Sequence, residues 1–347
     1  MQLRLLQVLG CPKCSSELHC EPSENSETGE IVSGQLTCPE CGQVYPIEAG
    51  IPRFVLKDNY ASSFGFQWNL FKSEQIDSVN GTTLSQNRFN AETGWTREWL
   101  RKKWILDLGC GAGRFLDVAS NSDAEVVGVD ISSAIDAAKS NLAGRKNVHF
   151  VQASIYELPF RPAVFDGCYC IGVVQHTPDP QRTIETLPRV LRPGGRIAIT
   201  AYERKPWTMF YAKYWLRLLT RRMDKRKLLS RIKRAMPILF PVTNVLFRLP
   251  IVGRVLMFTI PVANYVNETS LTPKQRYDWA ILDTFDMLSP EFDFPRTQKE
   301  VEEALTAGGV VDLRRLPNPG VNIVGAKGVC DEVGTDSWDR PSIDTKV

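Results

Sequence analysis

The regular alternation of apolar and helical segments between residues 104 and 200 constrains the fold of this chain more than any other feature. Runs typical of buried strands lie at 104–108, 125–130, 148–154, 165–172 and 196–200. Helical segments and short turns separate these runs. Because parallel strands need crossover segments that cover the faces of the sheet, the alternation predicts an α/β fold with a doubly wound, mostly parallel sheet.

The turn after the first strand is rich in glycine and reads GCGAG at residues 109–113. A dinucleotide-binding loop has the spacing GxGxxG, and a P-loop continues with Lys and Ser or Thr. Here the third glycine comes one residue earlier, and Asp107 ends the strand. The pattern resembles motif I of class I S-adenosylmethionine-dependent methyltransferases, which have a Rossmann-like sheet. In that family the bare glycine turn accommodates the amino-acid part of the cofactor.

This resemblance implies S-adenosylmethionine as the cofactor and indicates where it is contacted. Asp130 ends the second strand, where a carboxylate accepts hydrogen bonds from both ribose hydroxyls. Ser154 departs from the family pattern, since many relatives carry Asp beside the adenine amino group, and a hydroxyl binds there less strongly. Arg88 is a candidate for holding the methionine carboxylate, with a structural ion pair as an equal alternative. The expected cofactor-binding residues are Asp107, Gly109, Cys110, Gly111, Gly113, Asp130, Ile131, Ser154, Ile155, Gly172 and Arg88.

His176 is the candidate catalytic residue. It follows the fourth strand, at the sheet edge where doubly wound folds bind ligands, and an imidazole titrates near neutral pH. It is therefore the expected general base, and the equal alternative is that it orients the loop beside Pro178. The run from 104 to 200 and the final part of the chain, a helix at 297–307 and strands near 310–315 and 321–327, resemble the methyltransferases of ubiquinone and menaquinone biosynthesis.

Four of the nine cysteines form two CxxC pairs near the N-terminus. Cys11, Cys14, Cys38 and Cys41 have the spacing of a zinc ribbon, in which four thiolates hold a structural zinc ion at about 2.3 Å. Two disulfides in a secreted protein are the weaker alternative, since no secretion signal is evident. The pairs and the YPIEAGIPRF segment at 45–54 resemble the small zinc-ribbon activators of tRNA, rRNA and protein methyltransferases over residues 3–56.

The segment from 203 to 295 is expected to be a helical insertion on the acceptor side. Between residues 203 and 234 there are twelve Lys or Arg residues and only two acidic residues. The following stretch, 235–263, is apolar and contains four prolines, which we expect to interrupt its helices. One interpretation is a lid packed on the core. The second is peripheral membrane contact through 207–263, or binding of a lipid-carried acceptor. Contact with nucleic acid is a third that the sequence does not exclude.

No apolar stretch in the sequence predicts a membrane-spanning helix or a signal peptide. The charge-free stretches are shorter than the roughly 18 to 20 residues that cross a bilayer, and the apolar run before Cys11 is too short for a signal peptide. We expect a cytoplasmic protein, and the sequence leaves peripheral membrane contact open.

The sequence also predicts how the chain is divided. The expected divisions are a zinc ribbon at 1–56, a helical cap at 57–100, the first part of the core at 101–202, the insertion at 203–295, the last part of the core at 296–330 and a flexible tail at 331–347.

The sequence thus predicts a zinc ribbon followed by a methyltransferase that carries a helical insertion. The expected acceptor is a hydroxyl or amine of a small molecule, or of a lipid- or sugar-linked intermediate. Two alternatives stay open. One is an RNA or protein methyltransferase that uses the ribbon for recognition, and the other is a cofactor-binding scaffold without catalysis.

Overall fold

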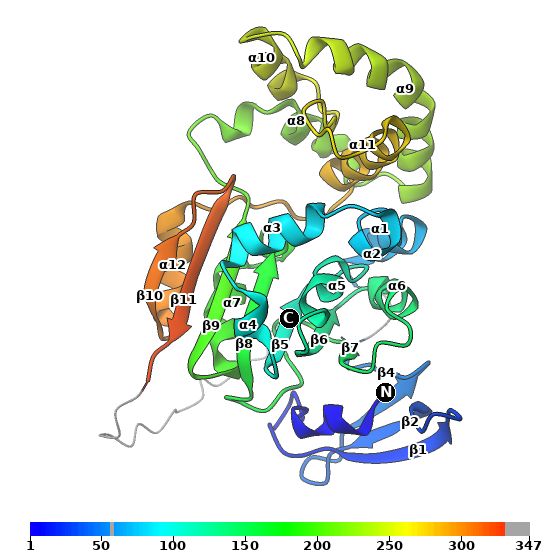
Figure 1. Cartoon of the computed structure of the whole chain (residues 1–347), viewed down its shortest axis with the longest axis vertical. Helices are drawn as coiled ribbons and strands as arrows, with labels where there is room; N and C mark the ends of the chain where they lie inside the picture. The colour runs from blue at the N-terminus through cyan, green and yellow to red at the C-terminus, as the bar shows by residue number, and fades with distance from the viewer. Residues whose placement is uncertain (56–58, 330–347) are drawn as a thin grey trace, which may run out of the picture.

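The computed structural model describes residues 1–55 and 59–329. The tail predicted at 331–347 lies outside the described residues. Along its long axis the molecule has a small sheet at one end, a large sheet flanked by helices in the middle, and a group of helices at the other end (Figure 1).

The large sheet has the strand order β10-β11-β9-β8-β5-β6-β7. The strands β5 to β9 are mutually parallel, and β11 and β10 add in antiparallel fashion beside β9. The α/β, mostly parallel fold predicted from the alternation is therefore confirmed. The strand bounds are β5 Trp104–Leu108, β6 Glu125–Asp130, β7 Val148–Gln152, β8 Phe165–Ile171, β9 Leu191–Ala201, β10 Val310–Arg315 and β11 Val321–Lys327.

The fifth parallel strand is longer than predicted. It begins at Leu191, whereas the sequence predicted a turn at 192–195 and a strand from Arg196. Pairing with β8 passes from Leu191 directly to Arg196, so the intervening residues bulge out of the ladder, and Gly194 has a positive φ of 75°. The predicted turn is thus accommodated inside the strand as an irregularity.

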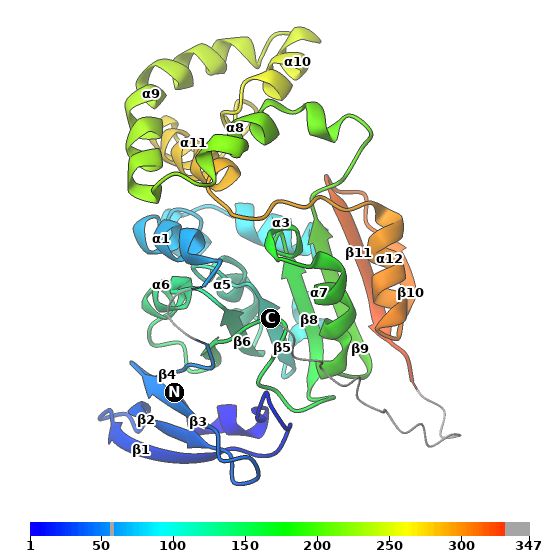
Figure 2. The ribbon, with the colours of Figure 1, turned by 180° about the vertical axis from the view of Figure 1, so that it is seen from behind.

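Helices cover both faces of the large sheet. Apolar residues of α3, α4, α5 and α6 pack on one face, and those of α7 and α12 pack on the other (Figures 1 and 2). A capping box at Thr297 starts α12, in which Thr297 and Glu300 satisfy each other's backbone N–H groups. The bounds are α3 Leu84–Thr93, α4 Arg97–Leu100, α5 Arg114–Ser120, α6 Ala134–Asn141, η2 Val174–His176, α7 Pro180–Thr186, η3 Leu187–Val190 and α12 Gln298–Ala307.

The N-terminal module supplies a layer that the large sheet otherwise lacks. The connection at 153–164, between β7 and β8, contains no helix. Leu5, Leu36 and Ile47 of the module fill this position, because they belong to the same buried cluster as Val151 of β7. The module consists of η1 Leu3–Gln7 and an antiparallel sheet of β1 His19–Asn25, β2 Ile31–Thr37, β3 Val44–Glu48 and β4 Ile51–Pro52.

Polar contacts fix the module in place. Phe54 N–H donates to the Gln152 carbonyl oxygen at 2.8 Å, at the end of β7. The Arg53 guanidinium donates to Gln152 Oε1 and to Asp136 Oδ1, each at 2.7 Å, and Arg53 has a side chain only 12% exposed. The module is therefore docked by a shared apolar core and by a nearly buried cation.

The helices of the insertion stack beyond the carboxyl ends of the parallel strands, at the end of the molecule opposite the N-terminal module (Figure 1). We expected prolines to break this segment, but α9 continues through Pro237 and Pro241 as a helix of 22 residues. A proline can stay inside a helix where the lost backbone hydrogen bond costs less than the packing gained, and Met236 beside Pro237 is fully buried. The bounds are η4 Thr208–Phe210, α8 Ala212–Thr220, α9 Lys225–Leu246, α10 Val252–Thr259 and α11 Pro273–Leu288.

Two further helices, α1 Ser62–Leu70 and α2 Asp77–Asn80, lie between the large sheet and the insertion. Helix α1 packs on both α6 and α11. Among the described residues, no helix combines the length and the hydropathy that crossing a bilayer requires. The domain divisions drawn from the sequence stay predictions.

Candidate functional site

A cavity of about 820 Å³ lies between the carboxyl ends of the parallel strands and the helical insertion. Its floor comes from the turns after β5, β6, β7 and β8, its sides from α1 and α3, and its roof from residues of α8, α10 and α11. This volume falls within the range of roughly 300 to 1,000 Å³ that is typical of small-ligand sites. The predicted site residues that line it are Arg88, Gly109, Cys110, Gly111, Asp130, Ile131, Ile155, Gly172 and His176.

The glycine turn is shaped by close packing. Gly109 has a φ of 75°, and a Cβ atom there would lie 2.5 Å from Val173. Gly111 also has a positive φ, and a Cβ on it would lie 3.2 Å from Trp68 Nε1, inside the cavity wall. The turn therefore presents bare backbone to the cavity, which suits a ligand that approaches closely. Gly113 is the N-cap residue of α5 and packs toward Leu142, so it shapes the turn without lining the cavity.

Asp130 is a buried carboxylate at the cavity wall. Its Oδ2 accepts from Gly111 N–H at 3.0 Å, and its Oδ1 accepts from Ser132 N–H at 2.8 Å and Ser132 Oγ at 2.7 Å. Burial raises its pKa, and these three hydrogen bonds oppose the rise. Each carboxylate oxygen can accept two hydrogen bonds, so Oδ1 is filled and Oδ2 keeps one position for a ligand, fewer than the two that both ribose hydroxyls would need.

Asp107 lies behind the turn and is not part of the cavity wall. It is 2% exposed, and burial raises its pKa well above the usual range for a carboxyl group. A hydrogen bond with the Tyr169 side chain opposes this rise. It precedes Leu108, which does line the cavity.

Arg88 and Ser154 differ in their access to the cavity. Arg88 lines it, and its Nε donates to Glu92 Oε1 at 2.7 Å while the guanidinium lies over the Phe115 ring at 5.6 Å. The ion pair that the sequence offered as an alternative is therefore present, and it leaves the other guanidinium nitrogens to face the cavity. Ser154 Oγ accepts from Tyr156 N–H at 3.2 Å and does not line the cavity.

His176 has a defined tautomer. Its Nδ1 lies 2.9 Å from the carbonyl oxygen of Phe292, and because a carbonyl oxygen can only accept, Nδ1 carries the proton. The neutral ring then has an acceptor lone pair on Nε2. The rings of Phe64 and Tyr202 lie 5.2 Å and 5.5 Å away, so the imidazole is held from two sides.

Two acidic residues of α11 also line the cavity and were not among the predicted site residues. Asp283 and Asp286 lie three positions apart, on one face of the helix. Burial and the neighbouring Asp286 raise the pKa of Asp283 to about 7, although Arg114 and Arg88 act in the opposite direction. Their three-residue spacing is visible in the sequence, but spacing alone does not tell which way the helix faces.

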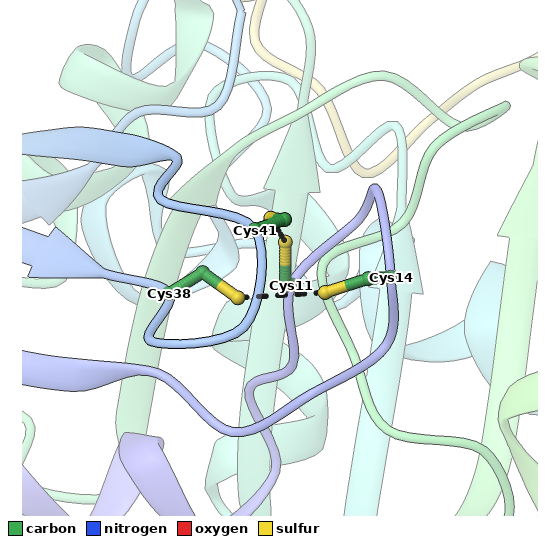
Figure 3. Close-up of side chains that lie close together, drawn as sticks. All are labelled: Cys11, Cys14, Cys38 and Cys41. Carbon is green, nitrogen blue, oxygen red and sulfur yellow. Dashed lines mark hydrogen bonds between the residues drawn. The ribbon is translucent and has the colours of Figure 1, made fainter.

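The four cysteines of the CxxC pairs converge on one point (Figure 3). Their sulfur atoms all lie within 4.8 Å of one another, with Cys11 Sγ 3.6 Å from Cys41 Sγ and Cys14 Sγ 3.4 Å from Cys38 Sγ. Four thiolates at about 2.3 Å from a zinc ion lie about 3.8 Å apart at the corners of a tetrahedron. All four are free thiols, so the arrangement fits a closed structural zinc site and not two disulfides.

Two family models match this chain. The model described as Trm112p-like protein matches residues 2–50, and the model described as methyltransferase domain matches residues 106–199. The chain joins a Trm112p-like zinc ribbon to a methyltransferase domain. Both resemblances predicted from sequence are thus confirmed, and a methyltransferase domain of this fold implies S-adenosylmethionine as its cofactor.

Curated relatives match about a third of the chain. An O-methyltransferase of Aspergillus nomiae is 34% identical over 131 residues, which are 36% of this chain and 57% of the relative. The ubiquinone biosynthesis O-methyltransferase of Coxiella burnetii is 32% identical over 126 residues, which are 35% of this chain and 54% of the relative. The chain therefore spans about half the length of these relatives.

Solved structures give partial likenesses. One contains the Haloferax volcanii Trm112 methyltransferase activator in complex with a methyltransferase, with 12% identity, 79% of this chain and 100% of that chain covered, and a TM-score of 0.44. A methyltransferase of Aquifex aeolicus has 13% identity, 78% of this chain and 98% of that chain covered, and a TM-score of 0.40.

Proposed function

We propose that this protein is an S-adenosylmethionine-dependent methyltransferase that acts on a hydroxyl or amine of a small molecule or of a lipid- or sugar-linked acceptor. One observation carries the proposal. A single cavity has the bare glycine turn and Asp130 at its floor, and aromatic and apolar side chains of the insertion at its roof, among them Tyr211, Met257 and Phe258. Cofactor and acceptor can therefore meet in one space.

The chain's own contribution to the reaction is placement and proton transfer. S-adenosylmethionine supplies an electrophilic methyl group on a positively charged sulfur. The glycine turn and Asp130 would hold the cofactor, Arg88 would offer a cation to its carboxylate, and the walls of the cavity would exclude water. The acceptor must then lose a proton as it attacks.

His176 is the proposed general base for a hydroxyl acceptor. Its Nε2 lone pair is the free acceptor of a ring that lines the cavity, and the Phe292 carbonyl fixes that tautomer. We expect His176→Ala to lower kcat by about 100-fold or more while cofactor binding is unchanged. A variant that keeps its kcat at every pH would exclude this role, and that result would favour an amine acceptor.

The cofactor assignment is tested by calorimetry. We expect S-adenosylmethionine to bind and NAD not to bind. Asp130→Ala should lower the affinity by roughly 1.5 to 3 kcal/mol, since it removes charge-assisted hydrogen bonds. Asp123→Ala, an exposed acid on the turn before β6, is the matched control and should bind like the parent. An unchanged dissociation constant in Asp130→Ala would sink the assignment of this residue.

The exposed apolar side of α8 favours an acceptor that is apolar or carried by a lipid. Helix α8 has its polar side toward the protein, where Lys213 Nζ contacts Asp293 Oδ2 at 2.9 Å, and its apolar side toward solvent. Trp215 is 64% exposed and Leu219 is 70% exposed. Exposed apolar faces of this kind mark interaction surfaces, and the basic residues nearby complement an anionic bilayer.

Co-sedimentation with anionic vesicles tests this part of the proposal. Binding that weakens with salt and with the double substitution Trp215→Ser and Leu219→Ser would support a membrane surface. No binding at low salt would leave only a lid over the cavity. No residue in the described range 1–55 lines the cavity.

A further inference from the structure

A second, smaller pocket of about 330 Å³ lies beside the cavity and is unusually rich in positive charge. It is lined by Tyr60, Ser62, Ser63, Arg221, Arg222, Lys225, Glu291 and Phe292. Three basic side chains therefore face a single acid, Glu291. The proposed methyl transfer uses none of these four charged side chains.

The basic side chains of the pocket have unused hydrogen-bonding capacity. Lys225 Nζ donates to the carbonyl oxygens of Arg221 at 2.9 Å and Ser289 at 2.6 Å, which anchors the ammonium and leaves its third proton available. The guanidinium groups of Arg221 and Arg222 form no ion pair among the described residues. Burial lowers the pKa of Lys225, and the charge of Arg217 acts in the same direction, so a bound anion would stabilise the charged form of this ammonium group.

A buried hydroxyl gives an independent indication of a ligand. Ser63 is 2% exposed and lines the pocket, yet its Oγ has no hydrogen-bond partner within the described chain. Ser62 and Ser63 are the first residues of α1, a helix of nine residues whose N-cap, Ala61, has no side-chain acceptor to offer. The positive end of the helix dipole thus points to the same pocket.

We propose that this pocket is a subsite for a phosphoryl group. A phosphate oxygen accepts hydrogen bonds from arginine, lysine and hydroxyl donors, and residues with all three donor types line the pocket beside the positive end of α1. A carboxylate would leave part of this donor set unsatisfied, because it has only two oxygens. The dianionic charge of a phosphate also matches the excess of basic over acidic side chains.

The pocket and the cavity are neighbours that share a wall. Tyr60 lines both, and its ring lies 5.7 Å from the ring of Phe292, whose carbonyl oxygen holds His176. A phosphorylated acceptor could place its reacting end in the cavity and its phosphate in the subsite. The assignment of the phosphate to the acceptor rests on the proposed function, whereas the subsite itself does not. The other source of the same group is the headgroup of an anionic lipid.

Calorimetry of the full chain with inorganic pyrophosphate at low salt tests the subsite. We expect binding, and we expect the double substitution Arg221→Gln and Arg222→Gln to weaken it at least tenfold. The control is Arg226→Gln with Lys227→Gln, which removes the same charge from exposed positions of α9 outside the pocket. Ser63→Ala should weaken binding several-fold without a change of charge.

If the parent does not bind pyrophosphate, the subsite is wrong. If the pocket and control variants lose pyrophosphate affinity equally, the anion binds a diffuse basic surface, and the subsite is wrong as well. S-adenosylmethionine affinity, measured on the same samples, should be the same in all variants. That readout separates a failure of the subsite from a failure of the proposed function. Vesicles of phosphatidylcholine with phosphatidic acid then distinguish the sources. If the pocket variant loses more vesicle binding than the control variant, the subsite binds a lipid headgroup. If both variants lose vesicle binding equally, the phosphoryl group belongs to a phosphorylated acceptor.

Discussion

The zinc ribbon and the helical insertion are both additions to the methyltransferase sheet, but the ribbon buries its apolar side chains whereas the insertion exposes many of its own. Leu5, Leu36 and Ile47 of the ribbon are at most 2% exposed and share one core with the sheet. Leu219 and Ile251 of the insertion are 70% and 83% exposed. The ribbon is therefore a completed layer of the fold, whereas the outer face of the insertion lacks a partner within the described chain.

The two regions also differ in how their charges are used. Arg53 next to the ribbon is nearly buried and bonded to Gln152 and Asp136, so it contributes to docking. Arg221 and Arg222 of the insertion are exposed and have no acidic partner among the described residues. The charges of the ribbon region thus serve to dock it on the sheet, whereas these charges of the insertion stay available at the surface.

The largest expected effect comes from the zinc site. Cys38→Ser removes one of four thiolates, and the free energy of binding a structural zinc ion, on the order of 10 kcal/mol, supports folding of the ribbon. Since the ribbon shares a core with the sheet, we expect loss of zinc and a folded fraction too small to purify in soluble form. Emission spectroscopy and thermal unfolding measure both. Cys20→Ser, which alters a thiol outside the cluster, is the control, and a Cys38→Ser protein with the parent's unfolding temperature would contradict the prediction.

Leu36 of the ribbon and Leu219 of the insertion form a matched pair, because the first is buried and the second is exposed. Leu36→Ala should cost about 2 to 5 kcal/mol of unfolding free energy, because it opens a cavity where the ribbon packs on the sheet. Urea unfolding followed by tryptophan fluorescence gives the number. A cost below about 1 kcal/mol would mean that the ribbon is attached less intimately than its burial indicates.

The inner face of the insertion should show a dependence on pH. Burial and Asp286 raise the pKa of Asp283 to about 7 in the folded protein, above its ordinary value of 3.8. Between these pH values the folded state keeps a proton that the unfolded state has lost, so stability falls as the pH rises from 4 to 7 and then levels off. Asp283→Asn should therefore be more stable than the parent at pH 8, on the order of 2 kcal/mol once screening in the open cavity is allowed for.

Urea unfolding at pH 5 and pH 8 checks this prediction. Asp278→Asn, on the same helix but paired with Lys274 at the surface, serves as the control and should leave the pH dependence unchanged. Equal stability differences between parent and Asp283→Asn at the two pH values would show that Asp283 ionises normally.

The smallest effect on stability is expected on the outer face of the insertion. Leu219→Ala should change the unfolding free energy by no more than about 0.5 kcal/mol, since the side chain contacts mainly solvent. It should nevertheless weaken binding to anionic vesicles in a sedimentation assay. A stability loss similar to that of Leu36→Ala would mean that this leucine is covered by the protein in solution, and the contrast between the two regions would fail.

Local patterns predicted much of this structure because local physics determines them. The apolar runs of the sheet, the glycine turn before α5 and the CxxC spacing each depend on a few neighbouring residues, and each lies where the sequence indicated. Ser154 and Asp107 were expected at the cofactor by family pattern, but the structure turns Ser154 to its own loop and places Asp107 behind the turn. Their roles stay predictions.

By itself, the sequence determined the order of strands and helices, the zinc ligands and the position of the glycine turn. Only the tertiary structure decided which side of each insertion helix faces the protein. In α8 the charged Arg217 lies inside, where Asp293 partners it, and Trp215 lies outside. Periodicity identifies two faces of a helix but not their surroundings, because burial is set by residues distant in sequence. The acidic pair of α11, the proton on His176 Nδ1 and the basic pocket beside Tyr60 depend on the same long-range packing.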